Sequence, residues 1–157
     1  MKHPYSCYPA RAARHWPNGI AVIDGERQLT FAELDARASA MAAALISRGL
    51  KTGERVAVIQ FNCLEFVVAA IAIARAGGVL CPMLGALTEH EHRYIAADSD
   101  ARFVVALTAG HFERARAVGA SPDAALGLGP FAGGADLLAC GDAPATLPAF
   151  DRAPGTL

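Results

Sequence analysis

The sequence lacks the charge pattern of several common protein classes. It carries 14 Lys and Arg against 15 Asp and Glu, a net charge of −1. This balance gives no reason to expect a nucleic-acid or anionic-membrane partner, and no basic stripe with interleaved aromatic residues is present. Residues 1–17 also contain no apolar core of signal-peptide length.

Long hydrophobic runs and paired cysteines are missing as well. The most apolar stretch, Phe66 to Ala74, is interrupted by Arg75, whereas a membrane span needs ~20 residues. It therefore predicts a buried helix. The cysteines are scattered without a CxxC pair (Cys7, Cys63, Cys81 and Cys140). A disulfide framework and a zinc site are both disfavoured, and a reducing cytoplasm is expected.

The composition that is present suits one apolar domain. The chain has 157 residues, of which 54% are hydrophobic and 18% charged. That is apolar for a small free-standing domain. A short helix is predicted over 9–16. Residues 20–23 and 26–31 then form a predicted β-hairpin around Asp24-Gly25, a pair that favours a tight turn.

After the hairpin, helical and strand patterns alternate. Apolar spacing predicts helices over 31–48, 63–76, 89–98 and 111–118, and strands over 56–61, 79–84 and 103–107. Pro82 argues for a position near the end of its strand. Strands that alternate with helices predict an α/β fold with a mostly parallel sheet.

The regular pattern ends at Gly119. Residues 119–157 are rich in Gly, Ala and Pro, with one apolar pair at Leu137 and Leu138. We interpret this segment as a loop or linker with at most one short strand, and residues 1–118 as the N-terminal α/β subdomain.

Three helix starts share the pattern of a capping box, in which a capping side chain and an acid three residues later bond each other's backbone amides. The predicted pairs are Thr30 with Glu33, Asn62 with Glu65, and Thr88 with Glu91. Flanking apolar residues such as Leu29 and Leu34 can close over the cap. On their own, these boxes imply no chemistry.

The order of these blocks is more informative. The hairpin and LTFAELDARASAMAAAL, then GERVAV, NCLEFVVAAIAIARAGGVLCPM and LTEHEHRYIAADSDARFVV, resemble the N-terminal part of the adenylate-forming (AMP-binding) superfamily. Acyl-CoA synthetases and their relatives are the nearest match. The resemblance implies a partial subdomain of the larger acyl-CoA synthetase fold. One departure follows Pro82, where the family usually has Asn and then Pro.

The resemblance also implies chemistry that this chain does not carry. Members join a carboxylate to ATP and pass the acyl group to a thiol, which requires a Ser/Thr/Gly-rich loop ending in lysine, Mg²⁺ and a C-terminal lid with a catalytic lysine. The glycine-rich stretch 127–134 has no Lys, Ser or Thr, and AGGV (76–79) follows a helix rather than a strand. We therefore assign no catalytic, cofactor-binding or metal residue. ATP, Mg²⁺ and coenzyme A are implied only for a full-length parent.

Other chemically suggestive residues have plainer interpretations. Glu89, His90, Glu91 and His92 are expected to be an acidic first helical turn rather than a metal cluster. Asn62 could line a cleft after a strand, but a capping role explains it. Cys63 and Cys81 are expected to be small buried side chains. Trp16 is predicted to be a packing anchor and His111 to start a solvated helix.

Three hypotheses follow. The chain is an N-terminal fragment of an acyl-CoA synthetase, inactive alone, whose partner is the remainder of the ligase and whose exposed apolar face promotes self-association. Alternatively, it is a non-catalytic binding module that kept the scaffold, or, least favoured, a small enzyme using this unit alone. The sequence does not specify the acid, nor separate CoA ligases from carrier-protein adenylation domains.

Overall fold

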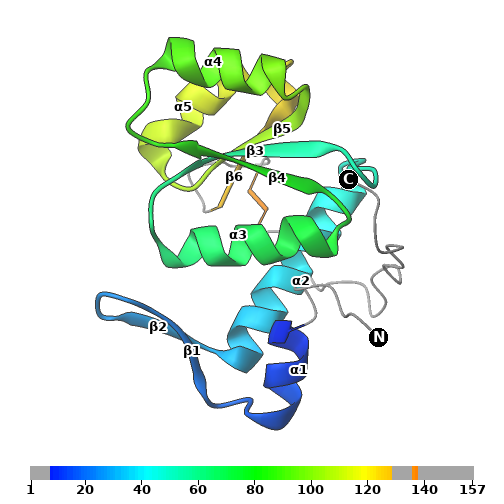
Figure 1. Cartoon of the computed structure of the whole chain (residues 1–157), viewed down its shortest axis with the longest axis vertical. Helices are drawn as coiled ribbons and strands as arrows, with labels where there is room; N and C mark the ends of the chain where they lie inside the picture. Colours follow the sequence, from blue (N-terminus) through cyan, green and yellow to red (C-terminus); the bar gives the residue numbers. More distant parts are fainter. Residues whose placement is uncertain (1–7, 129–135, 138–157) are drawn as a thin grey trace.

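A computed structural model of the chain describes residues 8–128 and 136–137, apart from the side chain of Pro122. It contains a short N-terminal helix, a hairpin and an α/β unit (Figure 1). The helices are α1 (Tyr8–His15), α2 (Phe31–Ser47), α3 (Leu64–Arg75), α4 (Glu89–Asp98), α5 (Ala109–Val118) and the 3₁₀ turn η2 (Pro122–Ala124). The strands are β1 (Ile20–Asp24), β2 (Arg27–Thr30), β3 (Arg55–Gln60), β4 (Val79–Leu84), β5 (Ala101–Ala106) and β6 (Ala125–Gly127).

The predicted hairpin and parallel sheet are both confirmed. β1 and β2 pair antiparallel around Gly25, whose φ of 61° suits a tight turn. The other strands form one sheet in the order β4-β3-β5-β6, with every neighbouring pair parallel. Pro82 lies inside β4 rather than at its end. Because β4 is an edge strand of the sheet, it tolerates a residue without a backbone N–H.

Alternate residues of the central strands build two separate cores. Val56 and Val58 pack with α2 and α3, whereas Ala57 and Ile59 pack with α4 and α5. Figure 1 shows the same layers, with α4 and α5 on one face of the sheet and α2 and α3 on the other. The continuous apolar run of β3 is therefore required because both of its faces are covered.

Two of the predicted capping boxes are confirmed. Thr30 accepts a hydrogen bond from the Glu33 amide at the start of α2, and Glu33 bonds back to the Thr30 amide. Thr88 and Glu91 repeat this arrangement at the start of α4. These backbone hydrogen bonds, together with those from the threonine hydroxyls, lower the pKa of Glu33 and of Glu91.

The sheet continues past residue 118. β6 pairs with β5, and Asp136 forms an isolated bridge to Gly127 while Leu137 is fully buried. Leu138 and most of the predicted linker lie outside the described residues, so the boundary at residue 118 stays a prediction. Within the described part of the chain, no helix is long and apolar enough to cross a membrane.

Candidate functional site

The carboxyl ends of the parallel strands gather several side chains that the sequence separates. Phe61 follows β3, Gly85 follows β4, and His111 lies in the first turn of α5. The rings of Phe61 and His111 meet edge to face at 5.1 Å, and the Thr108 hydroxyl lies 2.8 Å from His111 Nδ1. A Cβ at Gly85 would overlap the Phe61 ring. The His111 ring is therefore half-buried against Phe61, although the helix that it was predicted to start is exposed at Gly110, Glu113 and Arg116.

The predicted box of Asn62 and Glu65 does not form. The N-cap of α3 is Cys63, whose side chain makes no capping hydrogen bond. Instead the Leu64 amide donates to Asp24 Oδ2 of the hairpin, at 3.2 Å. Asn62 is exposed and lines a small pocket of about 250 Å³ between β1 and α3, so the cleft alternative, rather than the cap, describes it. Asp24 comes close to the start of α3 only when the chain folds, so the spacing of neighbouring residues could not predict this hydrogen bond.

The same junction holds a three-residue ion-pair network. Arg27 donates to both carboxylate oxygens of Glu65, at 2.6 and 3.2 Å, and also pairs with Asp24. The Leu64 amide and then Arg27 hold the pKa of Asp24 below its usual value. Burial is the largest single influence on Glu65 and would raise its pKa, but the hydrogen bonds and charge of Arg27, together with the Glu65 amide and the Cys63 side chain, lower the pKa overall. The network fixes the hairpin against the start of α3.

The Glu89–His92 stretch forms the first turn of α4. Glu89 pairs with Arg93 at 2.7 Å and Glu91 caps the helix, as expected for an acidic first turn. His92, in contrast, is fully buried, and its Nε2 donates to the Leu84 carbonyl at 2.9 Å. Across the described ranges, no three His, Cys, Asp or Glu side chains are grouped so that they could hold a metal ion.

The two described thiols and the AGGV glycines lie at positions where they serve the fold. Cys63 and Cys81 are free and partly buried, and burial raises the pKa of the Cys63 thiol. AGGV follows α3 and leads into β4, as predicted, and Gly77 has a φ of 84°. The stretch 127–134 falls largely outside the described residues. Among the described elements, no connection from a strand to a helix contains more than one glycine.

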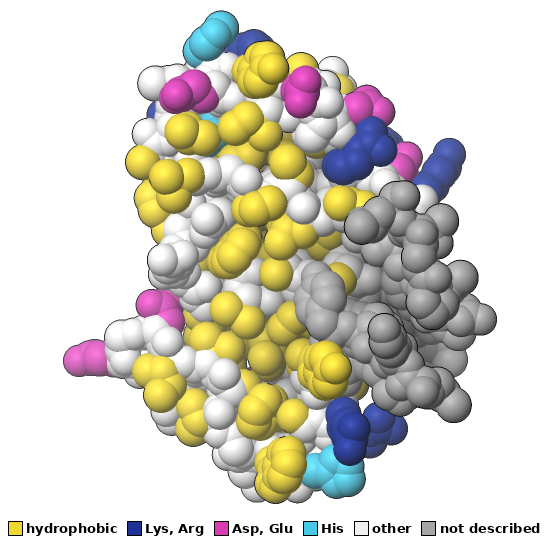
Figure 2. Space-filling model, viewed as in Figure 1, with side chains coloured by type: hydrophobic (Ala, Val, Ile, Leu, Met, Phe, Trp, Pro, Cys, Tyr) yellow, Lys and Arg dark blue, Asp and Glu magenta, His cyan; other side chains and the backbone are white. Residues whose placement is uncertain are grey.

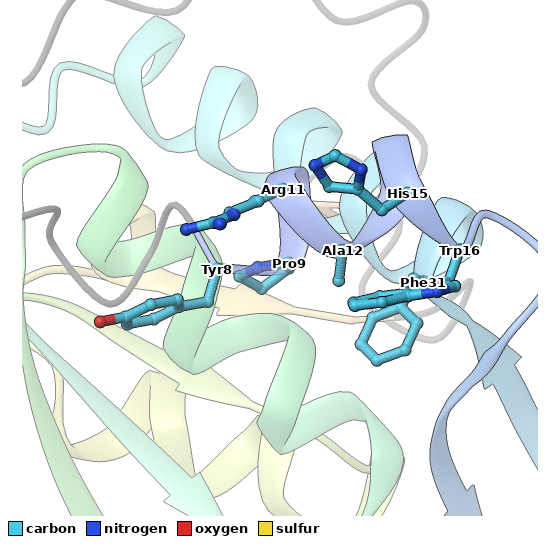
Figure 3. Close-up of a pocket in the computed structure, with 7 residues that line it drawn as sticks. All are labelled: Tyr8, Pro9, Arg11, Ala12, His15, Trp16 and Phe31. Atoms are coloured by element: carbon cyan, nitrogen blue, oxygen red, sulfur yellow. The ribbon is translucent and has the colours of Figure 1, made fainter.

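A groove beside α1 was missed by the sequence analysis. It has a volume of about 540 Å³ and is lined by Tyr8, Pro9, Arg11, Ala12, His15, Trp16 and Phe31. Figure 3 shows the rings of Tyr8, Trp16 and Phe31 along one side of α1, with Pro9 and Ala12 between them. Trp16 is 66% exposed, so its predicted role as a packing anchor is wrong. A tryptophan directly before Pro17 was the only signal available from the sequence.

These features define an open α/β sheet with a hairpin docked on its first crossover helix. The sequence profile of the AMP-binding enzyme family matches residues 9–130, and the chain belongs to that family. The fold matches the N-terminal subdomain of adenylate-forming enzymes, as the resemblance implied.

Similar proteins include two kinds of adenylate-forming enzyme. The chain is 34% identical to a component of the linear gramicidin synthase of Brevibacillus parabrevis over 70% of its own length and 1% of that protein's. It is 36% identical to a medium/long-chain-fatty-acid–CoA/3-oxocholest-4-en-26-oate–CoA ligase of Mycobacterium tuberculosis over 54% of its length and 15% of the ligase. The chain thus spans a small part of these curated relatives.

Solved structures give the same picture. VinN superposes with a TM-score of 0.71 and 28% identity, covering 76% of this chain and 31% of VinN. MbtA of Mycobacterium smegmatis superposes with a TM-score of 0.66 and 34% identity, covering 75% of this chain and 22% of MbtA.

Proposed function

We propose that this chain supplies the N-terminal scaffold of an ATP-dependent, AMP-forming acyl-CoA synthetase and that it is inactive alone. One observation carries the proposal of inactivity. The sequence contains only two lysines, Lys2 and Lys51, while the family's chemistry requires a lysine in the phosphate loop and another in the lid. The Lys51 amide bonds Glu54 in the turn before β3, at the amino end of the strand. Lys2 lies outside the described residues.

The charge of the reaction explains why this matters. Adenylation brings a carboxylate and a triphosphate together, and cations and oriented amides must offset their repulsion. In the described residues, no connection from a strand to a helix is rich in glycine, and none contains a lysine that could contact a phosphate. These residues do not fit ATP and Mg²⁺, so both, with coenzyme A, are assigned to a full-length parent. The mycobacterial CoA ligase among the relatives supports the acyl-CoA synthetase assignment, and the gramicidin synthase component supports a peptide-synthetase adenylation domain as the second candidate.

ATP–pyrophosphate exchange tests this proposal. The purified chain is assayed with Mg²⁺, ATP and a panel of fatty and aromatic acids, beside a full-length CoA ligase as positive control. We expect no exchange above background, with circular dichroism confirming that the chain is folded. Acid-dependent exchange by this chain would refute the proposed inactivity.

We also propose that the scaffold self-associates or binds the remainder of its ligase through an apolar face. Figure 2 shows hydrophobic side chains gathered in the middle of the face where Figure 1 draws α3 and β4. Ile23, Phe61 and Leu84 are 71%, 41% and 55% exposed. Apolar area of this kind favours association. A monodisperse, stable monomer in size-exclusion chromatography across a concentration series would contradict the proposed self-association.

A further inference from the structure

We propose that the groove along α1 docks an acidic amphipathic helix of a partner protein. This inference concerns a different part of the molecule from the α3 and β4 face and does not depend on the ligase assignment. It stands on three observations: an apolar floor, a cationic edge without acidic residues, and large aromatic rings that the protein leaves exposed.

The floor of the groove has the shape that a helix needs. Pro9 and Ala12 are small, and they separate the larger side chains of Tyr8, Trp16 and Phe31 (Figure 3). Small residues between large ones let the ridge of a second helix approach. An eight-residue helix such as α1 is about 12 Å long, which matches two turns of a partner with apolar residues at i, i+3 or i+4, and i+7.

The exposed rings point to an interface rather than to a local core. No residue of α1 is buried, and Tyr8 and Trp16 are 59% and 66% exposed. Aromatic residues that combine large contact area with few rotatable bonds are enriched at the energetic centres of protein interfaces. Tyr8 and Trp16 thus give a partner two exposed anchors, and the half-buried Phe31 ring lines the groove with them.

Charge decides the class of partner. α1 reads YPARAARH, so it carries Arg11, Arg14 and His15 and no acidic residue. In Figure 3, Arg11 and His15 lie along one edge of the groove, one helical turn apart. At the end of the molecule where Figure 1 draws α1, the space-filling view shows basic and histidine side chains beside hydrophobic ones, with no acidic side chain among them. Such an edge complements glutamates and aspartates and repels a basic helix.

The chain provides its own reporter of occupancy. Trp16 is the only tryptophan in the sequence and lines the groove. The probe is a peptide of about 16 residues, long enough to form a helix on binding, built from Leu, one Phe and Glu with apolar residues on one face. A matched peptide with Lys in place of every Glu is the control. Titrating each into the full chain while recording Trp16 emission measures docking directly.

We expect a saturable change in Trp16 emission with the acidic peptide and none with the lysine peptide. The double variant Arg11→Glu/Arg14→Glu should weaken binding by about tenfold or more, since reversing edge charges turns attraction into repulsion. The matched variant Arg93→Glu/Arg116→Glu reverses two exposed arginines on α4 and α5, on the other face of the sheet, and should bind normally. Because all four side chains are on the surface, the melting temperatures should stay close to that of the parent.

Several results would overturn the proposal. Equal binding of the lysine peptide would remove the argument from charge, and binding that leaves Trp16 emission unchanged would place the contact elsewhere. A stronger response to a small aromatic acid such as indole acetate would make the groove a small-molecule site. Quenching that depends on protein concentration without peptide would assign it to a second copy of the chain.

Discussion

Replacing Arg75 tests how the two helices on one face of the sheet are joined. Arg75 ends the most apolar segment of the sequence, and its side chain is only 11% exposed. It crosses to α2, where it donates to Asp35 Oδ1 at 2.8 Å, to the Asp35 carbonyl at 3.0 Å and to Ser39 Oγ at 2.5 Å. Arg75→Met keeps the apolar stem and removes all three bonds.

The expected loss follows from these contacts. Hydrogen bonds to charged groups contribute about 1.5–3 kcal/mol, and removing one partner of a fully buried ion pair costs about 3–5 kcal/mol. Asp35 is 30% exposed, so water can partly replace the lost cation. We therefore expect Arg75→Met to lower the free energy of unfolding by roughly 2–3 kcal/mol. For a chain of this size that corresponds to roughly 4–12 °C in melting temperature.

Urea unfolding followed by circular dichroism measures this loss. Arg75→Lys retains one charge without the planar fork and should recover only part of the stability. In a double-mutant cycle with Asp35→Asn, we expect a coupling energy of about 1–2 kcal/mol. A loss below about 0.5 kcal/mol, the range of ordinary surface changes, would refute the reasoning, as would additive effects of the two substitutions.

Three further predictions concern the caps, the hairpin junction and a thiol. Thr30→Ala should lower the free energy of unfolding in urea by about 1 kcal/mol. Asn62→Ala should change it by less than about 0.5 kcal/mol, because Asn62 does not cap α3. Equal losses from the two substitutions would instead support a capping box formed by Asn62. The pKa of Asp24 is lowered in the folded state from 3.8, so the unfolded chain takes up its proton first. Stability should therefore fall as the pH drops below about 4, and Arg27→Ala should flatten that dependence in acid titrations of melting temperature. Burial raises the pKa of Cys63, so mass spectrometry should find it slowly alkylated by iodoacetamide at pH 7 and faster as the pH rises.

Local patterns predicted most of the fold because their causes are local. The 3.6-residue spacing of Leu34, Ala38 and Met41 gives α2 one buried stripe, and the structure buries all three. The Leu50 amide bonds back to the Leu45 carbonyl at 3.0 Å after Gly49 adopts a φ of 89°, which is the helix end that a glycine at this position predicts.

Predictions failed where a distant residue competes with a neighbour. Asn62 and Glu65 have the spacing of a capping box, but Asp24 and Arg27 reach the same helix start from a hairpin about 40 residues earlier. Their charged hydrogen bonds are stronger than a neutral cap, so the long-range arrangement prevails. β6 was difficult for a related reason: three residues carry no visible period, and only pairing with β5 makes them a strand.

The features that identify the fold are also different from the residues that would carry out adenylation. Caps, buried strands and apolar crossovers are repeated wherever the scaffold is built, so they identify the family without carrying its chemistry. Adenylation depends on cations aimed at phosphate, and of the two lysines that could serve, the described one lies at the amino end of β3, opposite the edge where an open α/β sheet binds ligands. Tyr8, Arg11 and Trp16, in contrast, are exposed together beside α1, and the fold does not require this exposure. The α1 groove is therefore the described surface whose exposed side chains the fold itself does not explain.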